Sequence, residues 1–264
     1  MIKHELSTDE YAFWTENHYL RIPQALAGEQ VTQLKQWTQE LADWPESPGQ
    51  WMKYFETPAH SDQRQLCRVE NFVQYHSELD NLIRGNGVMT LLARLMNEPA
   101  LLFKEKINFK LPGGSGFGAH QDAPAFTTFG HNYHITMLIA VDDSNVENGC
   151  LEMSNPVPVY ETLTQEADGT IARDLESQMQ WTPLPTQAGD VVFFDSYIPH
   201  RSKPNTSQTP RRALYITYNR ASEGDVREDY YAHKRQAFPP ECERIAGVDY
   251  SETAGPYNLG NPIR

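Results

Sequence analysis

The sequence predicts a mainly β protein with flanking α-helices, arranged as an antiparallel sandwich or jelly roll. Two observations predict it: apolar residues repeat with helical spacing early in the chain, and short β-like runs separated by turn residues fill the remainder. Hydrophobic residues make up 39% of the 264 residues, enough for a substantial core. Because no linker or repeat divides the chain, we expect one domain over 1–264, with a helical part at about 1–98, a jelly-roll core at about 99–220 and an extension at 221–264.

Three helical segments are expected in the N-terminal part. Residues 7–10 read S-T-D-E, a capping box that begins a helix, and the strand-like Y-L-R-I-P at 19–23 follows it. Residues 28–44 and 77–97 both repeat apolar side chains on one helical face. Two glycines inside the last segment predict a break there.

Five β-like runs define the expected core. They are L-L-F-K-E-K-I-N-F-K-L at 101–111, H-I-T-M-L-I-A-V at 134–141, G-C-L-E-M at 149–153, D-V-V-F-F-D at 190–195 and R-A-L-Y-I-T-Y at 212–218. Each run is rich in β-branched and aromatic residues and is bounded by Gly, Pro, Asn or Asp. Such spacing is typical of antiparallel sheets.

Composition excludes several functional classes. The formal net charge of −13 argues against binding to a nucleic-acid backbone, which requires a clustered basic surface. The most apolar stretch, V-M-T-L-L-A-R-L-M at 88–96, is too short to span a membrane, and the N-terminus lacks an apolar signal core. Three widely spaced cysteines form no disulfide framework, so we expect a cytoplasmic protein.

Two distant segments could supply a metal site. The stretch G-A-H-Q-D-A-P-A-F contains His120 and Asp122, a pair that by itself is usually an ordinary polar turn. A strongly β-forming run ends in I-P-H at His200. Two imidazoles and one carboxylate on one face of an iron leave positions open for substrate and O₂. His131 and His134, beside a strand, are expected to be hydrogen-bonding residues outside this shell.

An arginine follows eleven residues after the distal histidine. On a strand, Arg211, Ala213, Tyr215 and Thr217 share one side, and this row is polar with a small residue beside the arginine. Such a pocket would suit a dicarboxylate. The alternative is an edge strand that displays the arginine to water.

Together these elements resemble the phytanoyl-CoA dioxygenase family of iron- and 2-oxoglutarate-dependent oxygenases. The resemblance also covers N-G-C-L-E at 148–152 and Q-A-G-D-V-V-F-F-D at 187–195. It implies a double-stranded β-helix (jelly roll) flanked by helices, which binds Fe(II) and uses 2-oxoglutarate and O₂ as co-substrates. It further implies that Arg211 pairs with the distal carboxylate of 2-oxoglutarate, with Ser202 and Asn108 as helpers.

The resemblance also bears on the substrate. Where the family usually has G-S-H, residues 154–158 read S-N-P-V-P, which argues against a large acyl-CoA. The longer signatures F-K-E-K-I-N-F-K-L-P-G-G, F-F-D-S-Y-I-P-H-R-S and the tail Y-N-L-G-N-P-I are most similar to members that act on organophosphonates. This implies hydroxylation of 2-aminoethylphosphonate to 2-amino-1-hydroxyethylphosphonate, with release of succinate and CO₂. A separate diiron oxygenase would then cleave the product.

The strand that carries F-K-E-K-I-N-F-K supplies possible substrate contacts. Lys104, Lys106, Asn108 and Lys110 share one face, while the apolar residues lie mainly on the other. A row of cations suits a phosphonate dianion and the carboxylates of 2-oxoglutarate, although a solvated face is the alternative. Arg201, beside His200, is a further candidate.

Other contacts are less well defined by the sequence. Gln121 lies between two proposed metal ligands, but an extended backbone would turn its side chain away from the metal. Tyr133, Thr136 and Phe126 are expected either to line the pocket or to pack in the core. The substrate ammonium group needs a carboxylate, carbonyls or aromatic faces. Spacing does not rank the possible sources, which are Tyr54, Phe55, Glu56, Glu70 and Asn71.

Several alternatives remain open at this level. The nearest is another small zwitterion on the same scaffold, such as the trimethylated phosphonate or an ectoine-like molecule. A zinc hydrolase with the same ligands would work without O₂. A non-catalytic jelly-roll binding protein would bind its ligand without releasing succinate.

Overall fold

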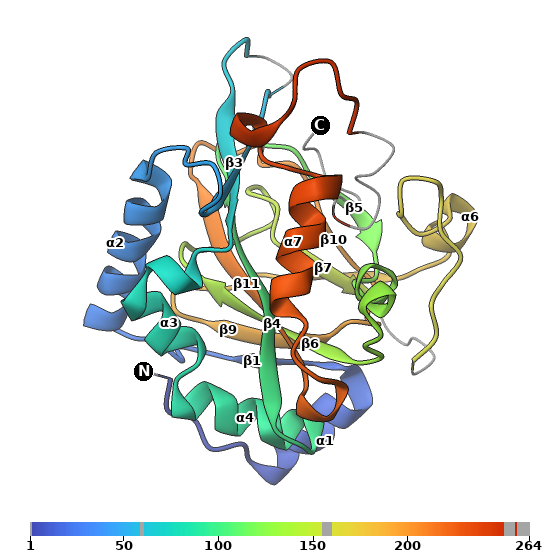
Figure 1. The fold of residues 1–264 in the computed structure, drawn as a ribbon. Helices are drawn as coiled ribbons and strands as arrows, with labels where there is room; N and C mark the ends of the chain where they lie inside the picture. The colour runs from blue at the N-terminus through green and yellow to red at the C-terminus, as the bar shows by residue number, and fades with distance from the viewer. Residues whose placement is uncertain (1, 59–60, 155–159, 251–256, 258–264) are drawn as a thin grey trace.

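The computed structural model describes residues 2–58, 61–154, 160–250 and 257 (Figure 1). Two antiparallel sheets lie at its centre, one of seven strands in the order β1-β9-β6-β11-β4-β3-β2 and one of four in the order β5-β10-β7-β8. The strands are β1 Tyr19–Ile22, β2 Met52–Glu56, β3 Gln65–Glu70, β4 Ala100–Lys110, β5 Phe117–His120, β6 His134–Ala140, β7 Leu151–Ser154, β8 Trp181–Leu184, β9 Val191–Asp195, β10 His200–Ser202 and β11 Arg211–Arg220.

Helices flank the larger sheet (Figure 1). The expected capping box is present, because the Ser7 side chain accepts from the backbone N–H of Glu10 and the Glu10 side chain accepts from that of Ser7. The expected break in the third helical segment falls between α3 and α4. The α-helices are α1 Thr8–Asn17, α2 Glu29–Asp43, α3 Ser77–Ile83, α4 Asn86–Met96, α5 Ala123–Phe126, α6 Arg173–Glu176 and α7 Arg227–Ala237, and the 3₁₀ turns are Val73–Tyr75, Thr127–Phe129, Ala221–Glu223 and Glu241–Glu243. None of the helices described here is long and apolar enough to cross a membrane.

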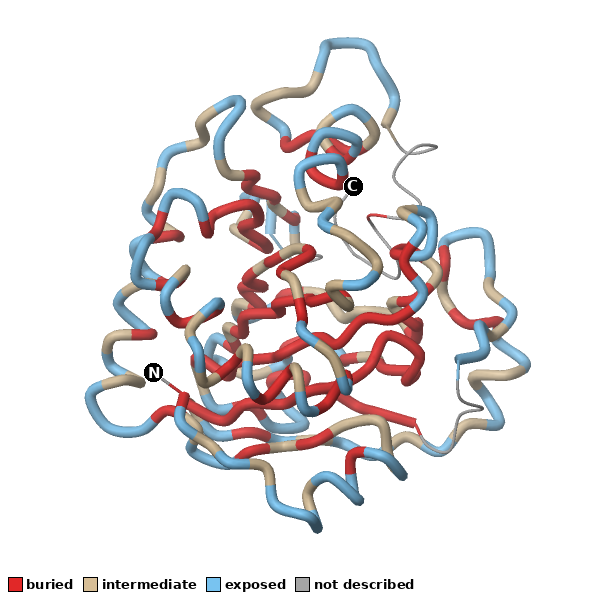
Figure 2. The backbone as a smooth tube through the Cα atoms, turned by 60° about the horizontal axis from the view of Figure 1, so that its bottom comes forward, coloured by how far each residue is buried: buried red, intermediate tan, exposed pale blue. Residues whose placement is uncertain are grey.

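The larger sheet is buried on both faces, and Figure 2 shows this concentration of buried residues in the central strands. One face packs against the helices with Ile107, Met137 and Leu214 among its residues. The other face packs against the smaller sheet with Leu138 and Tyr215 among its residues. Alternate residues of each strand therefore serve two different cores, and the inner one lies between the sheets.

Five strands were not anticipated from the sequence: β2, β3, β5, β8 and β10. β2 and β3 lie within the first 98 residues and extend the larger sheet beyond β4. The β3 run Q-L-C-R-V-E looks like a surface segment, yet its charged residues Arg68 and Glu70 are both buried. A shift of register places Phe103 opposite no residue of β11, and its ring packs against Phe126 rather than with the other apolar residues of β4.

Helix α7 covers the part of β4 that β3 leaves unpaired, and Figure 1 shows it running alongside that strand. The hydroxyl of Tyr231 accepts from the backbone N–H of Glu105 at 3.1 Å and donates to its carbonyl at 3.0 Å. The guanidinium of Arg227 donates to the Glu105 carboxylate at 2.9 Å. These contacts satisfy an open strand edge and fix α7 beside the inner core.

Candidate active site

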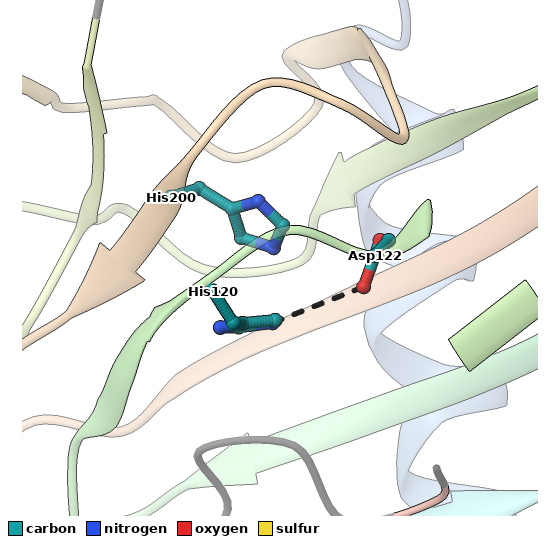
Figure 3. A group of neighbouring side chains, drawn as sticks. All are labelled: His120, Asp122 and His200. Atoms are coloured by element: carbon teal, nitrogen blue, oxygen red, sulfur yellow. Dashed lines mark ion pairs between the residues drawn. The ribbon is translucent and has the colours of Figure 1, made fainter. Parts of the chain in front are cut away.

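His120, Asp122 and His200 come together at one end of the smaller sheet, as Figure 3 shows. His120 ends β5 and His200 begins β10, and the two residues are direct partners across these paired strands. Asp122 follows two residues later, where the chain turns into α5. One ligand atom from each of the three side chains lies within 4.8 Å of the others, and His120 Nε2 is 3.8 Å from Asp122 Oδ1.

Backbone carbonyls orient both imidazole rings. His120 Nδ1 lies 2.7 Å from the carbonyl of Gly118, and His200 Nδ1 lies 3.1 Å from that of Ile198. Because a carbonyl only accepts, each Nδ1 carries the proton and each Nε2 presents a lone pair to the centre of the group.

The charge state of the three side chains also suits a cation. Burial, together with His200, lowers the pKa of His120 to about 3, and burial lowers that of His200. Burial raises the pKa of Asp122, but His200 and Lys106 outweigh this and hold it well below its usual range. Two neutral imidazoles and one carboxylate on one side of a centre fit a divalent transition metal with positions left open. Within the described residues, no other group of His, Cys, Asp and Glu could hold a metal ion.

The chain before His200 is held by a buried carboxylate. Asp195 Oδ1 accepts from the backbone N–H groups of Tyr197 and Ile198 at 2.9 and 3.0 Å, and Asp195 Oδ2 lies 2.6 Å from His18 Nδ1. The carbonyl of Ile198 is the one that orients His200. Asp195 therefore supports the turn from which the His200 side chain projects.

Gln121, between His120 and Asp122, also has a supporting role through buried hydrogen bonds. Its amide nitrogen donates to the carbonyls of Tyr197 and Glu161 at 2.5 and 3.0 Å, and its oxygen accepts from the N–H of Leu163 at 2.7 Å. The side chain is fully buried and lines neither cavity beside the triad. The structure thus turns Gln121 away from the site, where it ties three segments together.

His131 and His134 lie apart from the triad. Their rings are within hydrogen-bonding distance, 3.2 Å from Nδ1 to Nε2, and both contact Phe103. Tyr133 also packs away from the site, below the guanidinium of Arg220. These three residues belong to the packing around β6.

A cavity opens beside the triad between the two sheets. Three of the four residues of the polar β4 face line it, and Lys110 instead donates to the Ser202 hydroxyl at 2.7 Å. The lining residues are Lys104, Lys106, Asn108, Phe117, His120, Asp122, Thr136, Leu151, His200, Arg201, Ser202, Tyr215 and Thr217.

Arg211 lies deeper between the sheets. It lines a neighbouring cavity, which shares Leu151 with the first. Its Nη2 donates to the Tyr215 hydroxyl at 3.0 Å, and Tyr215 itself lines the first cavity. Arg211 is only 2% exposed, so the edge-strand alternative does not describe its position.

Arg201 is committed to other partners. Its Nε donates to Glu152 at 2.7 Å, its Nη1 donates to Glu176 at 2.8 Å, and its guanidinium lies 4.2 Å from the ring centre of Trp181. Although it contributes to the cavity wall, its guanidinium is paired with Glu152 on β7 and Glu176 on α6.

A second cavity lies on the other side of β4 residues Lys104 and Lys106, towards α7. It shares these lysines, Phe117, His120 and Asp122 with the first cavity. Its four cationic side chains exceed its two carboxylates, one of which is a triad residue. The lining residues are Arg68, Glu70, Lys104, Lys106, Phe117, His120, Asp122, Ala125, Phe126, Lys234 and Tyr257.

The family of the chain can now be stated. The model of the phytanoyl-CoA dioxygenase family matches residues 14–213, which include the triad and Arg211. The chain belongs to this family. The predicted family is confirmed, and with it the prediction of a dioxygenase with a jelly-roll fold.

Curated relatives match this chain over most of its length. The chain is 53% identical to a 2-aminoethylphosphonate dioxygenase from uncultured bacterium HF130_AEPn_1, and the match covers 95% of this chain and 96% of that relative. It is 42% identical to a methylphosphonate hydroxylase from Gimesia maris, and the match covers 85% of each chain. Among solved structures, the epimerase SnoN in complex with Fe³⁺, α-ketoglutarate and nogalamycin RO shares the fold, with a TM-score of 0.64, 18% identity, and coverage of 97% of this chain and 94% of that one.

Two charged residues of the second cavity, Arg68 and Lys234, were missed by the sequence analysis. Arg68 was missed because β3 was not recognised as a strand, although R-V-E places Arg68 and Glu70 on one face. Lys234 comes from α7, and no motif in that helix indicates a site. Of the five possible ammonium partners named above, Glu70 alone lines a cavity beside the triad. The S-N-P-V-P segment at 154–158 and the tail Y-N-L-G-N-P-I at 257–263 lie almost wholly outside the described residues.

Proposed function

We propose that this protein is an Fe(II)- and 2-oxoglutarate-dependent dioxygenase that hydroxylates 2-aminoethylphosphonate to 2-amino-1-hydroxyethylphosphonate. Similarity to a 2-aminoethylphosphonate dioxygenase over nearly the whole of both chains supports this substrate class. The structural observation that carries the proposal is a pair of half-buried lysines, Lys104 and Lys106, beside the His/Asp/His group. They face the cavities, and within the described residues no carboxylate forms an ion pair with either of them.

His120, Asp122 and His200 would hold the Fe(II). Their Nε2 atoms and the Asp122 carboxylate occupy one side of the centre, so the opposite side is free for 2-oxoglutarate, O₂ and substrate. Thr136 Oγ1 lies 3.5 Å from Asp122 Oδ2 and 3.0 Å from the Thr217 hydroxyl, so a short polar network supports the carboxylate.

The first cavity would take 2-oxoglutarate. The keto-acid end would lie at the metal, and the distal carboxylate would extend between the sheets towards Arg211 and the hydroxyl of Tyr215. Ser202 and Asn108 also face this cavity and supply polar contacts, as the family resemblance implies. A buried guanidinium with a hydroxyl neighbour suits a carboxylate because it offers several directed donors.

The phosphonate would bind at Lys104 and Lys106. The Lys104 ammonium lies 4.3 Å from the ring centre of Phe126. The Lys106 ammonium lies 5.5 Å from the ring centre of Tyr215. Neither has a hydrogen-bond or ion-pair partner in the described parts of the chain. Burial lowers the pKa of both, and the charges of Asp122 and Glu70 oppose this only in part. A phosphonate dianion would supply a direct counter-ion.

With Fe(II) and 2-oxoglutarate bound, the centre would convert O₂ and 2-oxoglutarate to CO₂, succinate and an oxidant that hydroxylates a C–H bond. The protein's own part is placement. Phosphonate contacts at Lys104 and Lys106, which share cavity walls with the proposed metal ligands, would hold the carbon next to phosphorus beside the metal site. The product would be passed to a separate diiron oxygenase for cleavage of the C–P bond. A cytoplasmic location fits the three free cysteines.

A succinate-release assay tests this function. The protein is supplied with Fe(II), 2-oxoglutarate and O₂, and the panel contains 2-aminoethylphosphonate, its trimethyl form, methylphosphonate, ectoine and an acyl-CoA. We expect succinate and the 1-hydroxylated product in equal amounts with 2-aminoethylphosphonate. Omission of O₂ should abolish turnover, which separates the oxygenase from a zinc hydrolase. Succinate release with ectoine but with no phosphonate would overturn the proposed substrate.

A further inference from the structure

The second cavity contains one carboxylate that the proposed metal site does not use. Asp122 would be occupied by the metal, so Glu70 is the remaining acidic side chain among the described residues that line either cavity. Glu70 is 1% exposed and ends β3. Any cationic group of a substrate in these cavities would therefore find its counter-ion at Glu70.

Two cations hold Glu70 in place without using its full capacity as an acceptor. Arg68 Nη1 donates to Oε1 at 3.3 Å, and Lys234 Nζ donates to Oε2 at 2.5 Å. Burial raises the pKa of Glu70, but Lys234 and Arg68 outweigh this and hold it at about 2. A carboxylate has about four acceptor positions, so an ionised Glu70 can receive another donor.

Glu70 also lies next to Lys106, one of the two lysines proposed to bind the phosphonate. It is the direct cross-strand partner of Lys106, and Arg68 is that of Asn108. Side chains paired in this way have Cβ atoms about 5 Å apart, a separation that a two-carbon bridge between phosphonate and amine can span. No ion pair joins Glu70 to Lys106 in the described structure, so their charged groups do not contact each other directly.

We propose that Glu70 binds the ammonium group of the substrate and is the residue that selects an aminophosphonate over a phosphonate without an amine. This inference rests on the proposed function. Lys234 is a positioning residue: it holds one oxygen of Glu70 and is itself fixed by the rings of Tyr54 and Tyr257, 5.2 and 5.7 Å away. In this way α7, outside the jelly roll, contributes to substrate choice.

Binding can be measured by calorimetry without O₂ on protein loaded with Fe(II) and 2-oxoglutarate. The probes are 2-aminoethylphosphonate and ethylphosphonate, which has the same carbon skeleton without the amine. We expect the wild-type protein to prefer the amine about 10- to 100-fold, since a charge-assisted hydrogen bond separates the two ligands. The ratio of the two Kd values is the readout, because general damage to the site would change both values together.

Two variants separate charge balance from recognition. Lys234→Met leaves Glu70 ionised with one fewer competitor, so the preference for the amine should persist or grow. Glu70→Gln combined with Lys234→Met keeps the net charge of the pair unchanged, and here the preference should fall to about onefold. Glu152→Gln is the matched control, since Glu152 also lies between an arginine and a lysine but lines neither cavity, and its preference should equal that of the wild type.

Each other outcome contradicts a definite statement. If the double variant keeps the wild-type preference, Glu70 does not bind the amine. If the wild-type protein binds both phosphonates equally, the inference about Glu70 fails while the proposed phosphonate site stands. If neither phosphonate binds or supports succinate release, the proposed function itself fails.

Discussion

Arg211 donates to the hydroxyl of Tyr215, 3.0 Å away, and both side chains lie on the inner face of β11. Arg211 is therefore a buried cation in the cavity that adjoins the one lined by the proposed metal ligands. Arg211→Met should raise the KM for 2-oxoglutarate about 10- to 100-fold, with metal binding retained, because the distal carboxylate loses a charged donor. Succinate release at varied 2-oxoglutarate measures this.

The neighbouring arginine provides the control for this prediction. Arg212 points to the other face of β11 and pairs with Asp142 through Nε and Nη2 at 2.8 and 2.9 Å. Arg212→Met should lower stability but leave the KM for 2-oxoglutarate unchanged. An unchanged KM in Arg211→Met would contradict the assignment of the first cavity.

The proposed metal ligands can be tested without reference to turnover. His120→Ala and His200→Ala should each lose most of the bound Fe(II) or Co(II) in equilibrium dialysis and should release no succinate, because two ligands hold the metal far less well than three. His131→Asn alters an equally buried histidine outside the group, so it should keep stoichiometric metal. Full metal content in either ligand variant would refute the site.

Replacement of Lys106, one of the lysines proposed to bind the phosphonate, should affect substrate binding and stability in opposite directions. Lys106→Met should raise the KM for the phosphonate about 10- to 100-fold and leave that for 2-oxoglutarate much less changed. In the absence of substrate, its free energy of unfolding should equal or exceed that of the wild type, because burial of an ammonium without a counter-ion is unfavourable. Steady-state kinetics and urea unfolding measure the two effects.

Lys53→Met is the matched control for the stability measurement. The Lys53 ammonium is also buried, but it donates to the carbonyls of Ala42 and Trp44 at 2.8 and 2.6 Å. Its loss should lower the free energy of unfolding and leave the phosphonate KM unchanged. Equal destabilisation by Lys106→Met would show that Lys106 has a structural partner instead of a vacant anion site.

The grouping of His120, Asp122 and His200 could be predicted from the sequence because local pattern carries part of the information. The β-forming run that ends in I-P-H indicated where His200 lies, and alternation along β4 indicated the lysine face. The pairing of β5 with β10, which brings His120 and His200 together, was not predicted because both strands are short. The second cavity was harder to predict. Its Glu70–Lys234 pair joins residues 164 positions apart, and no local periodicity reports such a contact. Buried charge pairs also make β3 read as a surface segment.

The contact between His18 and Asp195 predicts a pH dependence of stability. The hydrogen bond that His18 donates to Asp195 raises the pKa of His18 above its ordinary value of 6.5, although burial opposes it. A raised pKa in the folded state means that the stabilisation is fully present below pH 6.5 and is lost as the pH rises through the folded-state pKa. Removing the imidazole with His18→Gln should therefore cost about 1 kcal/mol more at about pH 5.5 than at about pH 9. Urea unfolding of both proteins at the two pH values measures the difference, and an equal cost at both would show that the imidazolium form of His18 does not stabilise the turn that carries His200.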